Sequence, residues 1–473
     1  MKQLLLPKKI MECKGVTNPE SLFVKQPPYA TIDKDLSKYF KIEGENSYII
    51  LDFGNEMNGG IRIITDWVGK WFCKFRIRFG ESYGEVNSDI GYKNAVNAHS
   101  PRDFESGVCS YGDIVIGQTG FRFVRIDLLE DKCIIIKNIY CENNILNRKS
   151  IYSYKGKDKD IKRIFTAAKR TVDLCAASGV LWDGIKRDRL LWIGDLAPEV
   201  MALSTMYGRT KEVEKSIDLG AELFPLPKYM NNMFTYSFWW LYMVGEYYSD
   251  FHCKEYISKH IEFITSFIKQ LDDVIDHEGN LPSDVRALVD WPSVDSVDEP
   301  VGRICIILLG LNKIETIFND FDLDKTHLNS VKEKVSKIDL TVKKMKQIIG
   351  LKYLATGHIT DEEYQILIEG GAKGFSTFMS YFILNAIASR DESLAIKLMK
   401  DYYLGMLDRG ATTFFEDFDI EWLNNSGRID EKTPDGLLDL HGDFGKHCYV
   451  GYRHSLCHGW SAGVIKFIKE HCK

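Results

Sequence analysis

The chain has 473 residues, of which 45% are hydrophobic and 27% are charged, and its formal net charge is −6. These are ordinary values for a folded globular protein, and a negative balance argues against nucleic acid as a partner. The longest apolar run, at 304–311, is too short to span a membrane. We therefore expect a protein that binds neither nucleic acid nor membrane.

The cysteines indicate a reducing compartment. Eleven cysteines are scattered along the chain without a Cys-x-x-Cys pair. The first residues, MKQLLLPKKI, contain a short apolar run that a proline ends, and this is too short for the apolar core of a signal peptide. Scattered thiols without such a signal are typical of intracellular proteins. We expect a cytoplasmic location.

The first third of the chain carries a β pattern. Residues 1–45 show little periodicity, and we expect them to form an N-terminal arm that wraps onto later domains. Over 46–155, short runs alternate apolar and polar residues between glycine-rich turns, as in FRFVRID at 121–127. This pattern is typical of an antiparallel sandwich with one face in water. We expect a β-sandwich domain over 46–155.

Beyond residue 155 the apolar period becomes helical. No fixed repeat is visible, which disfavours a regular solenoid and favours a closed α/α barrel over 156–473. The long loops at 180–195, 280–298, 408–435 and 436–458 carry unusual residues and could meet at one mouth of such a barrel. Helices are expected near 160–177, 197–207, 211–224, 233–249, 253–275, 299–319, 327–349, 373–389, 391–407 and 459–471.

The segment WDGIKRDRLLWIGDLAPE at 182–199 concentrates charge and tryptophan. It contains three carboxylates (Asp183, Asp188 and Asp195), three cations and two tryptophans. Two glycines interrupt it, so we expect a loop that leads into a helix beginning at Leu196, with Asp195 as its cap. The alternative is a surface turn with solvated charge pairs. Carboxylates beside arginine and indole favour a pocket that binds or cleaves a sugar.

Two later segments carry further candidates. In GATTFFEDFDIEW at 410–422, Glu416 lies among aromatic residues. An apolar setting raises the pKa of a carboxyl group, which is how proton-transfer groups are tuned. The alternative is a structural acid that accepts hydrogen bonds from loop amides. In SLCHGWSAG at 455–463, His458 could bond a sugar hydroxyl or a carboxylate. The His and Cys spacings over 441–458 match no zinc pattern, so we expect no metal and no other cofactor.

Two tryptophans elsewhere are also candidates for a sugar-binding wall. Trp240 belongs to a Trp-Trp pair and Trp291 to the sequence VDWP, and each is as compatible with a core position as with a pocket wall. A serine-hydrolase elbow, a phosphate-binding loop and a dinucleotide glycine motif are missing from the sequence, which disfavours those enzyme classes.

Together the three motifs resemble the α-L-rhamnosidases of glycoside hydrolase family 78. The resemblance rests on DGIKRDRLLWIGD, GATTFFE and SLCHGWSAG in this order, and on ILDFG, RIRFGE, NAHSPRD and FRFVRI upstream. It covers roughly 45–465. It implies an N-terminal antiparallel β-sandwich followed by a six-hairpin (α/α)6 barrel with the active site at the barrel mouth.

The resemblance also implies roles. In such enzymes an acid of the first motif protonates the glycosidic oxygen, and a Glu of the second activates water on the opposite face of the sugar. Asp188 is then the general acid and Glu416 the general base of an inverting hydrolase that removes terminal α-L-rhamnose, or a close deoxysugar, from oligosaccharides or glycosides. The residues implied to hold the sugar or line its pocket are Asp183, Arg187, Trp192, Asp195 and His458.

Two departures from the family pattern keep alternatives open. The acid is commonly Glu, whereas Asp188 is one methylene shorter, and a shift of about 1 Å in a catalytic group can cost about 100-fold in rate. We also expect no counterpart of the family's usual C-terminal β-domain. The alternatives are a catalytically impaired sugar-binding protein and another (α/α)-barrel enzyme, such as an unsaturated-uronide hydrolase or a polysaccharide lyase. A homodimer is one alternative for the oligomeric state.

Overall fold

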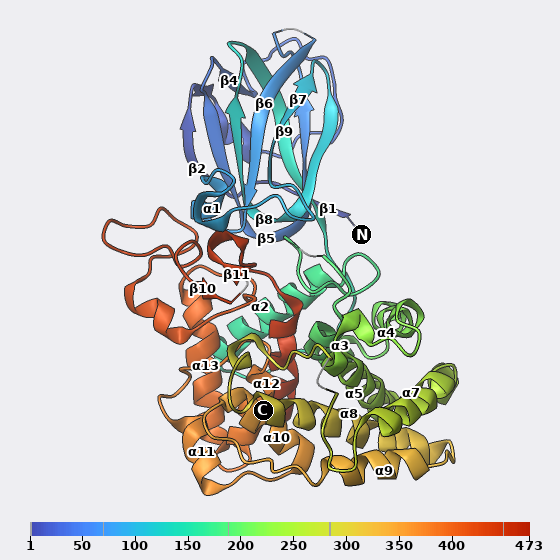
Figure 1. Ribbon diagram of the computed structural model, residues 1–473. Helices are drawn as coiled ribbons and strands as arrows, with labels where there is room; N and C mark the ends of the chain where they lie inside the picture. Colours follow the sequence, from blue (N-terminus) through green and yellow to red (C-terminus); the bar gives the residue numbers. More distant parts are fainter. Residues whose placement is uncertain (1, 70, 188, 283–284, 448) are drawn as a thin grey trace.

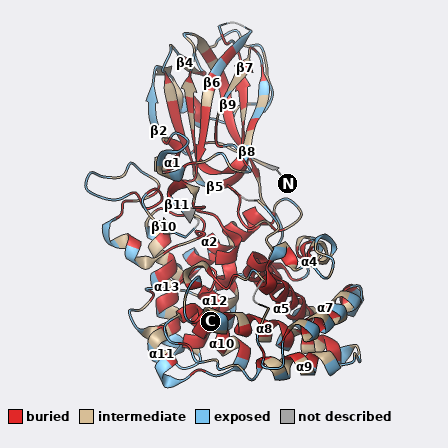
Figure 2. Ribbon diagram, in the orientation of Figure 1, coloured by how far each residue is buried: buried red, intermediate tan, exposed pale blue. Residues whose placement is uncertain are grey.

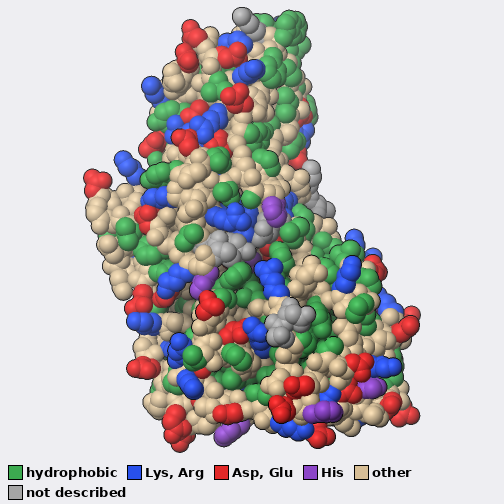
Figure 3. All heavy atoms as spheres, viewed as in Figure 1, with side chains coloured by type: hydrophobic (Ala, Val, Ile, Leu, Met, Phe, Trp, Pro, Cys, Tyr) green, Lys and Arg blue, Asp and Glu red, His purple; other side chains and the backbone are tan. Residues whose placement is uncertain are grey.

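The computed structural model describes residues 2–473 apart from 70, 188, 283–284 and 448. A region of antiparallel strands lies at one end of the molecule and a region of helices at the other (Figure 1). Within the described ranges, no helix is both long enough and apolar enough to cross a membrane. Acidic and basic side chains are interspersed over the helical region on the face drawn in Figure 3.

The described strands of the first region form one nine-stranded sheet in the order β3-β4-β9-β5-β8-β6-β7, with β1 on β9 and β2 on β5. Residues 1–45, expected as an arm that wraps onto later domains, contain four of these strands, which supply partners for the backbone groups of β5 and β9. The strands are β1 Lys2–Leu5, β2 Lys9–Lys14, β3 Val16–Thr17, β4 Phe40–Glu43, β5 Tyr48–Thr65, β6 Phe72–Gly80, β7 Asp103–Cys109, β8 Asp113–Leu128 and β9 Cys133–Asn144.

The sheet curls around an apolar core. Phe40 of β4 and Val108 of β7 come from opposite ends of the strand order, yet both belong to one buried cluster with alternate residues of β5 and β8. On the opposite face of β5, Ile50 packs with Phe123 and with Tyr83 of the short helix α1 (Tyr83–Val86). The period-2 alternation of the sequence therefore sorts side chains between the core and the outer face.

The helical region has inner and outer helices. Helix α3 is buried along its whole length and α5 along nearly all of it, whereas α4 and α7 bury one face each (Figure 2). The helices are α2 Lys159–Cys175, α3 Leu196–Tyr207, α4 Lys211–Leu223, α5 Phe234–Phe251, α6 Lys254–Ser258, α7 Ile261–Val274, α8 Glu299–Asp320, α9 Thr326–Val335, α10 Lys346–Thr356, α11 Asp361–Ile368, α12 Ser380–Ala388, α13 Glu392–Asp408 and α14 Val464–His471.

Two expected helices are divided in the structure. The stretch 327–349 is not one helix, because α9 ends at Val335 and α10 begins at Lys346. The segment between them is held by Asp298, whose carboxylate accepts hydrogen bonds from three consecutive backbone amides, 343–345, at 2.8–3.0 Å. The stretch 253–275 is likewise two helices, α6 and α7, and helix α11 was not expected from the sequence.

The end of the sheet that faces the helical region contacts it beside the three motifs. Arg122 of β8 donates to the carbonyl of Gly410 at 2.8 Å, and its guanidinium also pairs with Asp52 of β5 at 2.8 Å. The backbone amide of Glu56 donates to the Thr412 hydroxyl at 2.8 Å. Because these contacts fix the segment that leads to residue 416, the sheet positions one wall of the candidate site.

Candidate active site

A cavity of about 260 Å³, which we call the central cavity, lies where four loops of the helical region meet. Six of the residues singled out in the sequence line it: Asp183, Trp192, Asp195, Trp291, Glu416 and His458. Six further residues complete its wall: Met233, Tyr236, Arg286, Leu288, Arg453 and Trp460. The predicted general acid, Asp188, lies outside the described residues.

The loop of the first motif is tied to the third motif through Asp183. The carboxylate of Asp183 accepts a hydrogen bond from the amide of Leu190 at 2.9 Å, and its own amide donates to the carbonyl of Leu190 at 3.1 Å. Its backbone carbonyl accepts from the amide of Gly459 at 2.7 Å. The neighbouring Gly184 forms a β-bridge with His458. The carboxylate of Asp183 is therefore held in a closed turn, 2% exposed, at the cavity wall.

Glu416 is held on several sides. One carboxylate oxygen forms an ion pair with the guanidinium of Arg187, and the other accepts from the amide of Ser455 at 3.1 Å. Its amide donates to the carbonyl of Ser455 at 2.9 Å, and its carbonyl accepts from the indole of Trp460 at 2.8 Å. Arg187 in turn donates to the carbonyl of Arg453 at 3.0 Å. The carboxylate thus has one defined orientation toward the cavity.

Asp195 and His458 lie next to each other in the cavity wall. Helix α3 begins at Leu196 with Asp195 at its N-cap position, as the sequence predicts, but the carboxylate does not cap the helix. It accepts instead from the phenol of Tyr236 at 2.7 Å. The Nε2 atom of His458 lies 4.0 Å from Asp195 and 3.8 Å from Glu416. His458 therefore lies between two carboxylates of the cavity wall.

Aromatic rings form the remaining walls. Trp192 meets Tyr236 edge to face at 6.4 Å, and Trp460 stacks on Phe378 at 5.1 Å, which fixes both indoles. Trp291 is half-buried at the cavity wall. An apolar ring wall combined with a few polar groups is the usual composition of a small-molecule site.

Trp240 does not belong to this site, which corrects the expectation from the sequence. It is fully buried in helix α5, and its indole N–H donates to the carbonyl of Ile217 at 2.9 Å. Its ring packs edge to face against Phe263 at 5.1 Å and His260 at 5.6 Å. The helical period turns Trp240 toward the outer helices α4 and α7, away from the cavity.

Three acids next to the cavity are perturbed by burial. Desolvation raises the pKa of Asp290 to about 7, although the hydroxyl of Ser376 donates to it. Burial and the charge of Glu416 raise the pKa of Asp417 to about 6. Burial, reinforced by the charges of Asp183 and Asp195, raises the pKa of Glu199 well above its ordinary value. Burial therefore favours the protonated form of each of these three acids.

A buried charged cluster behind the cavity links it to the sheet. Lys186 of the first motif lies 3.0 Å from Glu81, which follows β6, and 3.3 Å from Glu85 of α1. Glu81 also accepts from the amide of Leu456 at 2.7 Å and from the hydroxyl of Ser455 at 3.3 Å. Burial, only partly offset by Lys186, raises the pKa of Glu81 to about 7. Glu81 thus contacts both loops that hold Glu416.

Among the residues that the structure describes, two groups of side chains have the composition of a metal site. The donor atoms of Glu81, Glu85 and His441 lie within 4.8 Å of one another, but the Lys186 ammonium lies 3.4 Å from the His441 Nε2 atom and supplies the positive charge there. The donor atoms of Asp183, Asp195 and His458 are equally close. Carboxylates and imidazole in this arrangement can also bind sugar hydroxyls, so the expectation of no metal stays a prediction.

Several residues in or beside the cavity were not predicted from the sequence. Arg286 and Tyr236 lie outside the three motifs, although Arg286 belongs to the long loop 280–298 that the sequence marks as unusual. Trp460 and Ser455 lie within the third motif but gave no signal of their own. Glu81 belongs to a strand-like segment, and only the tertiary structure places it beside the site.

Comparisons by sequence give no match: no protein-family model and no curated protein matches this chain. Comparisons by structure give strong ones. The rhamnosidase from Klebsiella oxytoca, solved with rhamnose bound, aligns with a TM-score of 0.74 at 17% sequence identity, over 99% of this chain and 96% of that chain.

Two larger proteins also share the fold. The family 78 rhamnosidase of Bacillus sp. GL1 aligns with a TM-score of 0.68 at 16% identity, over 95% of this chain and 48% of that chain. The Streptomyces avermitilis α-L-rhamnosidase, complexed with L-rhamnose, aligns with a TM-score of 0.64 at 12% identity, over 90% of this chain and 43% of that chain. This chain therefore has the fold of these α-L-rhamnosidases and spans less than half the length of the larger two.

Proposed function

We propose that this chain is an inverting glycoside hydrolase that removes terminal α-L-rhamnose, or a close deoxysugar, from oligosaccharides or glycosides. The observation that carries the proposal is the central cavity, where Glu416, Asp183, Asp195 and His458 converge between indole rings. It lies in a fold similar over 99% of the chain to a rhamnosidase solved with rhamnose bound. A cavity of about 260 Å³ suits one small sugar ring better than a long polymer.

The contacts of Glu416 support its proposed role, and the family resemblance supports that of Asp188. Glu416 acts as the general base: its fixed carboxylate takes a proton from water that attacks the anomeric carbon. Asp188 acts as the general acid and protonates the departing oxygen. Inversion requires about 6.5–9.5 Å between the two carboxyl groups, so that water fits between sugar and base. Asp183, Asp195 and His458 bind the sugar hydroxyls, while Trp192 and Trp291 cover its apolar faces.

The finer architecture belongs to the same proposal. We assign 46–155 to a β-sandwich, to which the strands within 1–45 are added, and 156–473 to an (α/α)6 barrel. The alternation of fully buried helices with helices that bury one face supports a double ring of helices. The ten described cysteines are all free, which supports a reducing compartment such as the cytoplasm.

One observation supports a second candidate, a sugar-binding protein of the same fold with impaired turnover. The position of the general acid holds Asp188, whose side chain is one methylene shorter than the Glu usual in the resembling family. If the backbone does not compensate, proton delivery to the departing oxygen is weakened while the sugar contacts remain.

The test is hydrolysis of an aryl α-L-rhamnoside by the wild type, Glu416→Gln and Asp188→Asn. We expect turnover by the wild type, with β-rhamnose as the first product in NMR, and loss of at least about 1000-fold in Glu416→Gln. Asp188→Asn should lose less on this activated leaving group than on a natural glycoside. Absence of turnover, with rhamnose still raising the melting temperature, would favour the sugar-binding candidate.

A further inference from the structure

The sequence NAHSPRD at 97–103 forms a closed loop of the sheet region that does not line the central cavity. The side-chain oxygen of Asn97 accepts hydrogen bonds from the backbone amides of Arg102 and Asp103 at 2.9 and 3.1 Å. The guanidinium of Arg102 is buried and donates to the carbonyl of Ser88 at 2.6 Å. The loop is therefore fixed against the rest of the sheet region.

This loop contacts Arg189 of the first motif. The hydroxyl of Ser100 donates to the carbonyl of Gln118 at 2.5 Å. The guanidinium of Arg189 donates to the same carbonyl and, at 3.3 Å, to the Ser100 hydroxyl. It also lies over the indole of Trp182, 4.4 Å from the ring centroid. Two residues of the sheet region and one indole of its own segment therefore hold the side chain of Arg189.

The backbone of Arg189 depends on such contacts. Its φ angle of 53° lies in the left-handed region, which residues other than glycine rarely adopt. Its amide donates to the carbonyl of Arg187 at 2.8 Å. A residue in a sparsely populated backbone conformation persists only where the surrounding structure holds it, and such residues cluster at active sites. The contacts with the sheet region therefore help to keep this backbone in place.

Arg187 and Arg189 are the chain neighbours of Asp188, which itself lies outside the described residues. Arg187 is held by the helical region, through its ion pair with Glu416 and its hydrogen bond to the carbonyl of Arg453 at 3.0 Å. Arg189 is held by the sheet region. Because planar peptide bonds join the three residues, contacts that hold the two arginines also restrain the residue between them.

We propose that Arg189 is a positioning residue for the transfer of a proton to the departing oxygen, and that through it this step depends on the sheet region. The inference rests on the proposed hydrolase function with Asp188 as the general acid. Arg189 does not line the central cavity, so it acts through its chain neighbour. A displacement of about 1 Å in a catalytic group can cost about 100-fold in rate.

The test compares hydrolysis of para-nitrophenyl and para-methoxyphenyl α-L-rhamnoside, whose leaving groups are similar in size. The methoxyphenolate is the poorer leaving group and depends more on the proton from the general acid. We expect Arg189→Ala to lower kcat about 100-fold on the methoxyphenyl substrate and about tenfold on the nitrophenyl substrate, with little change in KM. The ratio of the nitrophenyl rate to the methoxyphenyl rate should therefore rise about tenfold, and it should also rise in Asp188→Asn. Arg189→Lys keeps a donor for the Gln118 carbonyl and should have a ratio closer to that of the wild type.

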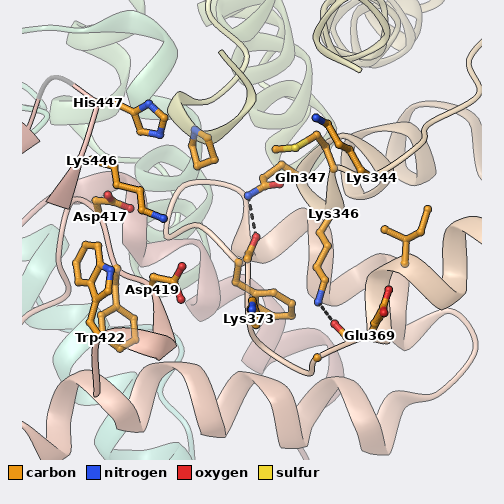
Figure 4. A pocket seen from close by; sticks show the side chains of 17 residues that line it. Lys344, Lys346, Gln347, Glu369, Lys373, Asp417, Asp419, Trp422, Lys446 and His447 are labelled. Carbon is orange, nitrogen blue, oxygen red and sulfur yellow. Dashed lines mark hydrogen bonds between the residues drawn. The ribbon is translucent and has the colours of Figure 1, made fainter. Parts of the chain in front are cut away.

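Lys346 offers a matched control in another part of the helical region (Figure 4). Its ammonium donates to the carbonyls of Glu369 and Gly371 at 2.6 and 2.8 Å. It also lies over the ring of Phe375, 5.5 Å from the centroid, so this cation likewise joins separate segments through backbone carbonyls and an aromatic ring. Lys346 lines a cavity of about 630 Å³ but does not line the central cavity. Lys346→Met should lower the free energy of unfolding and keep the wild-type ratio of the two rates.

The two substrates separate failure of the inference from failure of the proposed function. If Asp188→Asn raises the ratio but Arg189→Ala keeps the wild-type ratio, the positioning role is overturned while the hydrolase function stands. If the wild type hydrolyses neither substrate, or if Asp188→Asn keeps the wild-type ratio, the proposed function or its general acid fails, and the inference fails with it. A loss in Arg189→Ala that lies mainly in KM would indicate direct contact with the ligand and would also overturn the positioning role.

Discussion

Glu81 gives the sharpest test of how the sheet supports the site. Its carboxylate contacts Lys186 at 3.0 Å, the amide of Leu456 at 2.7 Å and the hydroxyl of Ser455 at 3.3 Å. The amide of Ser455 is also a donor to Glu416, at 3.1 Å. Glu81 does not line the central cavity, so it acts as a positioning residue that holds the loop on which the orientation of Glu416 depends.

Glu81→Ala removes the acceptor of the Leu456 amide and one partner of the buried Lys186. A buried donor left without an acceptor costs about 1–3 kcal/mol, and loss of one member of a buried ion pair costs about 3–5 kcal/mol. The cost to the ion pair is reduced here because Glu85 remains 3.3 Å from Lys186. We expect a decrease of about 3 kcal/mol in the free energy of unfolding. If the loop moves by about 1 Å, kcat should fall about 100-fold with little change in KM.

The assay is kcat and KM on an aryl α-L-rhamnoside at a temperature where every variant is folded. Glu81→Gln keeps an oxygen for the Leu456 amide and should retain at least tenfold more activity than Glu81→Ala. The matched control is Glu363→Ala, which breaks another buried Glu–Lys pair, with Lys352 at 2.6 Å, far from the cavity. It should lose stability but keep kcat. A folded Glu81→Ala with wild-type kcat would refute the positioning role.

Three further predictions concern the aromatic wall, pH and metal. Trp291→Ala should raise KM about tenfold with little loss of stability. Trp240→Ala should instead lower the free energy of unfolding by about 3–5 kcal/mol and leave KM unchanged. An increase in KM for Trp240→Ala would contradict its core position. The pKa of Asp290 is raised from 3.8 to about 7 in the folded state, so the native protein retains a proton that the unfolded chain releases, and stability falls as pH rises toward 7. In urea titrations, the free energy of unfolding of Asp290→Asn should lack this dependence, so that between pH 5 and 7 it should rise relative to the wild type by roughly 1 kcal/mol per pH unit. If the free energies of the two proteins change equally with pH, the raised pKa of Asp290 is disproved. Dialysis against a chelator should leave the hydrolysis rate unchanged, and activity that is lost and then restored by a divalent cation would assign Asp183, Asp195 and His458 to a metal instead.

The candidate site could be predicted where its residues lie close together in sequence. Asp183, Asp195, Glu416 and His458 stood out because glycines, aromatic residues and charges surround them in motifs, and all four line the central cavity. Trp240 could not be judged in the same way. Its neighbours Phe263 and His260 belong to another helical stretch, and the packing of α5 against that stretch decides which way the indole points.

The start of α10 shows the same limit. Its position depends on Asp298, whose carboxylate accepts hydrogen bonds from the amides of 343–345. Asp298 lies 45 residues before Lys343 in the chain, so no local pattern predicts this contact.

The sequence by itself determined the local features of this protein: the period-2 strands, the period-3.6 helices, the beginning of α3 at Leu196 and the three motifs that carry charge and indole. These depend on contacts between near neighbours along the chain, which a linear pattern records. Only the tertiary structure decided that residues 1–45 add strands to the sheet, that α9 and α10 are separate, and that Glu81 lies behind Glu416. Each of these depends on partners far apart in sequence, and such long-range partners leave no periodic signal in the chain.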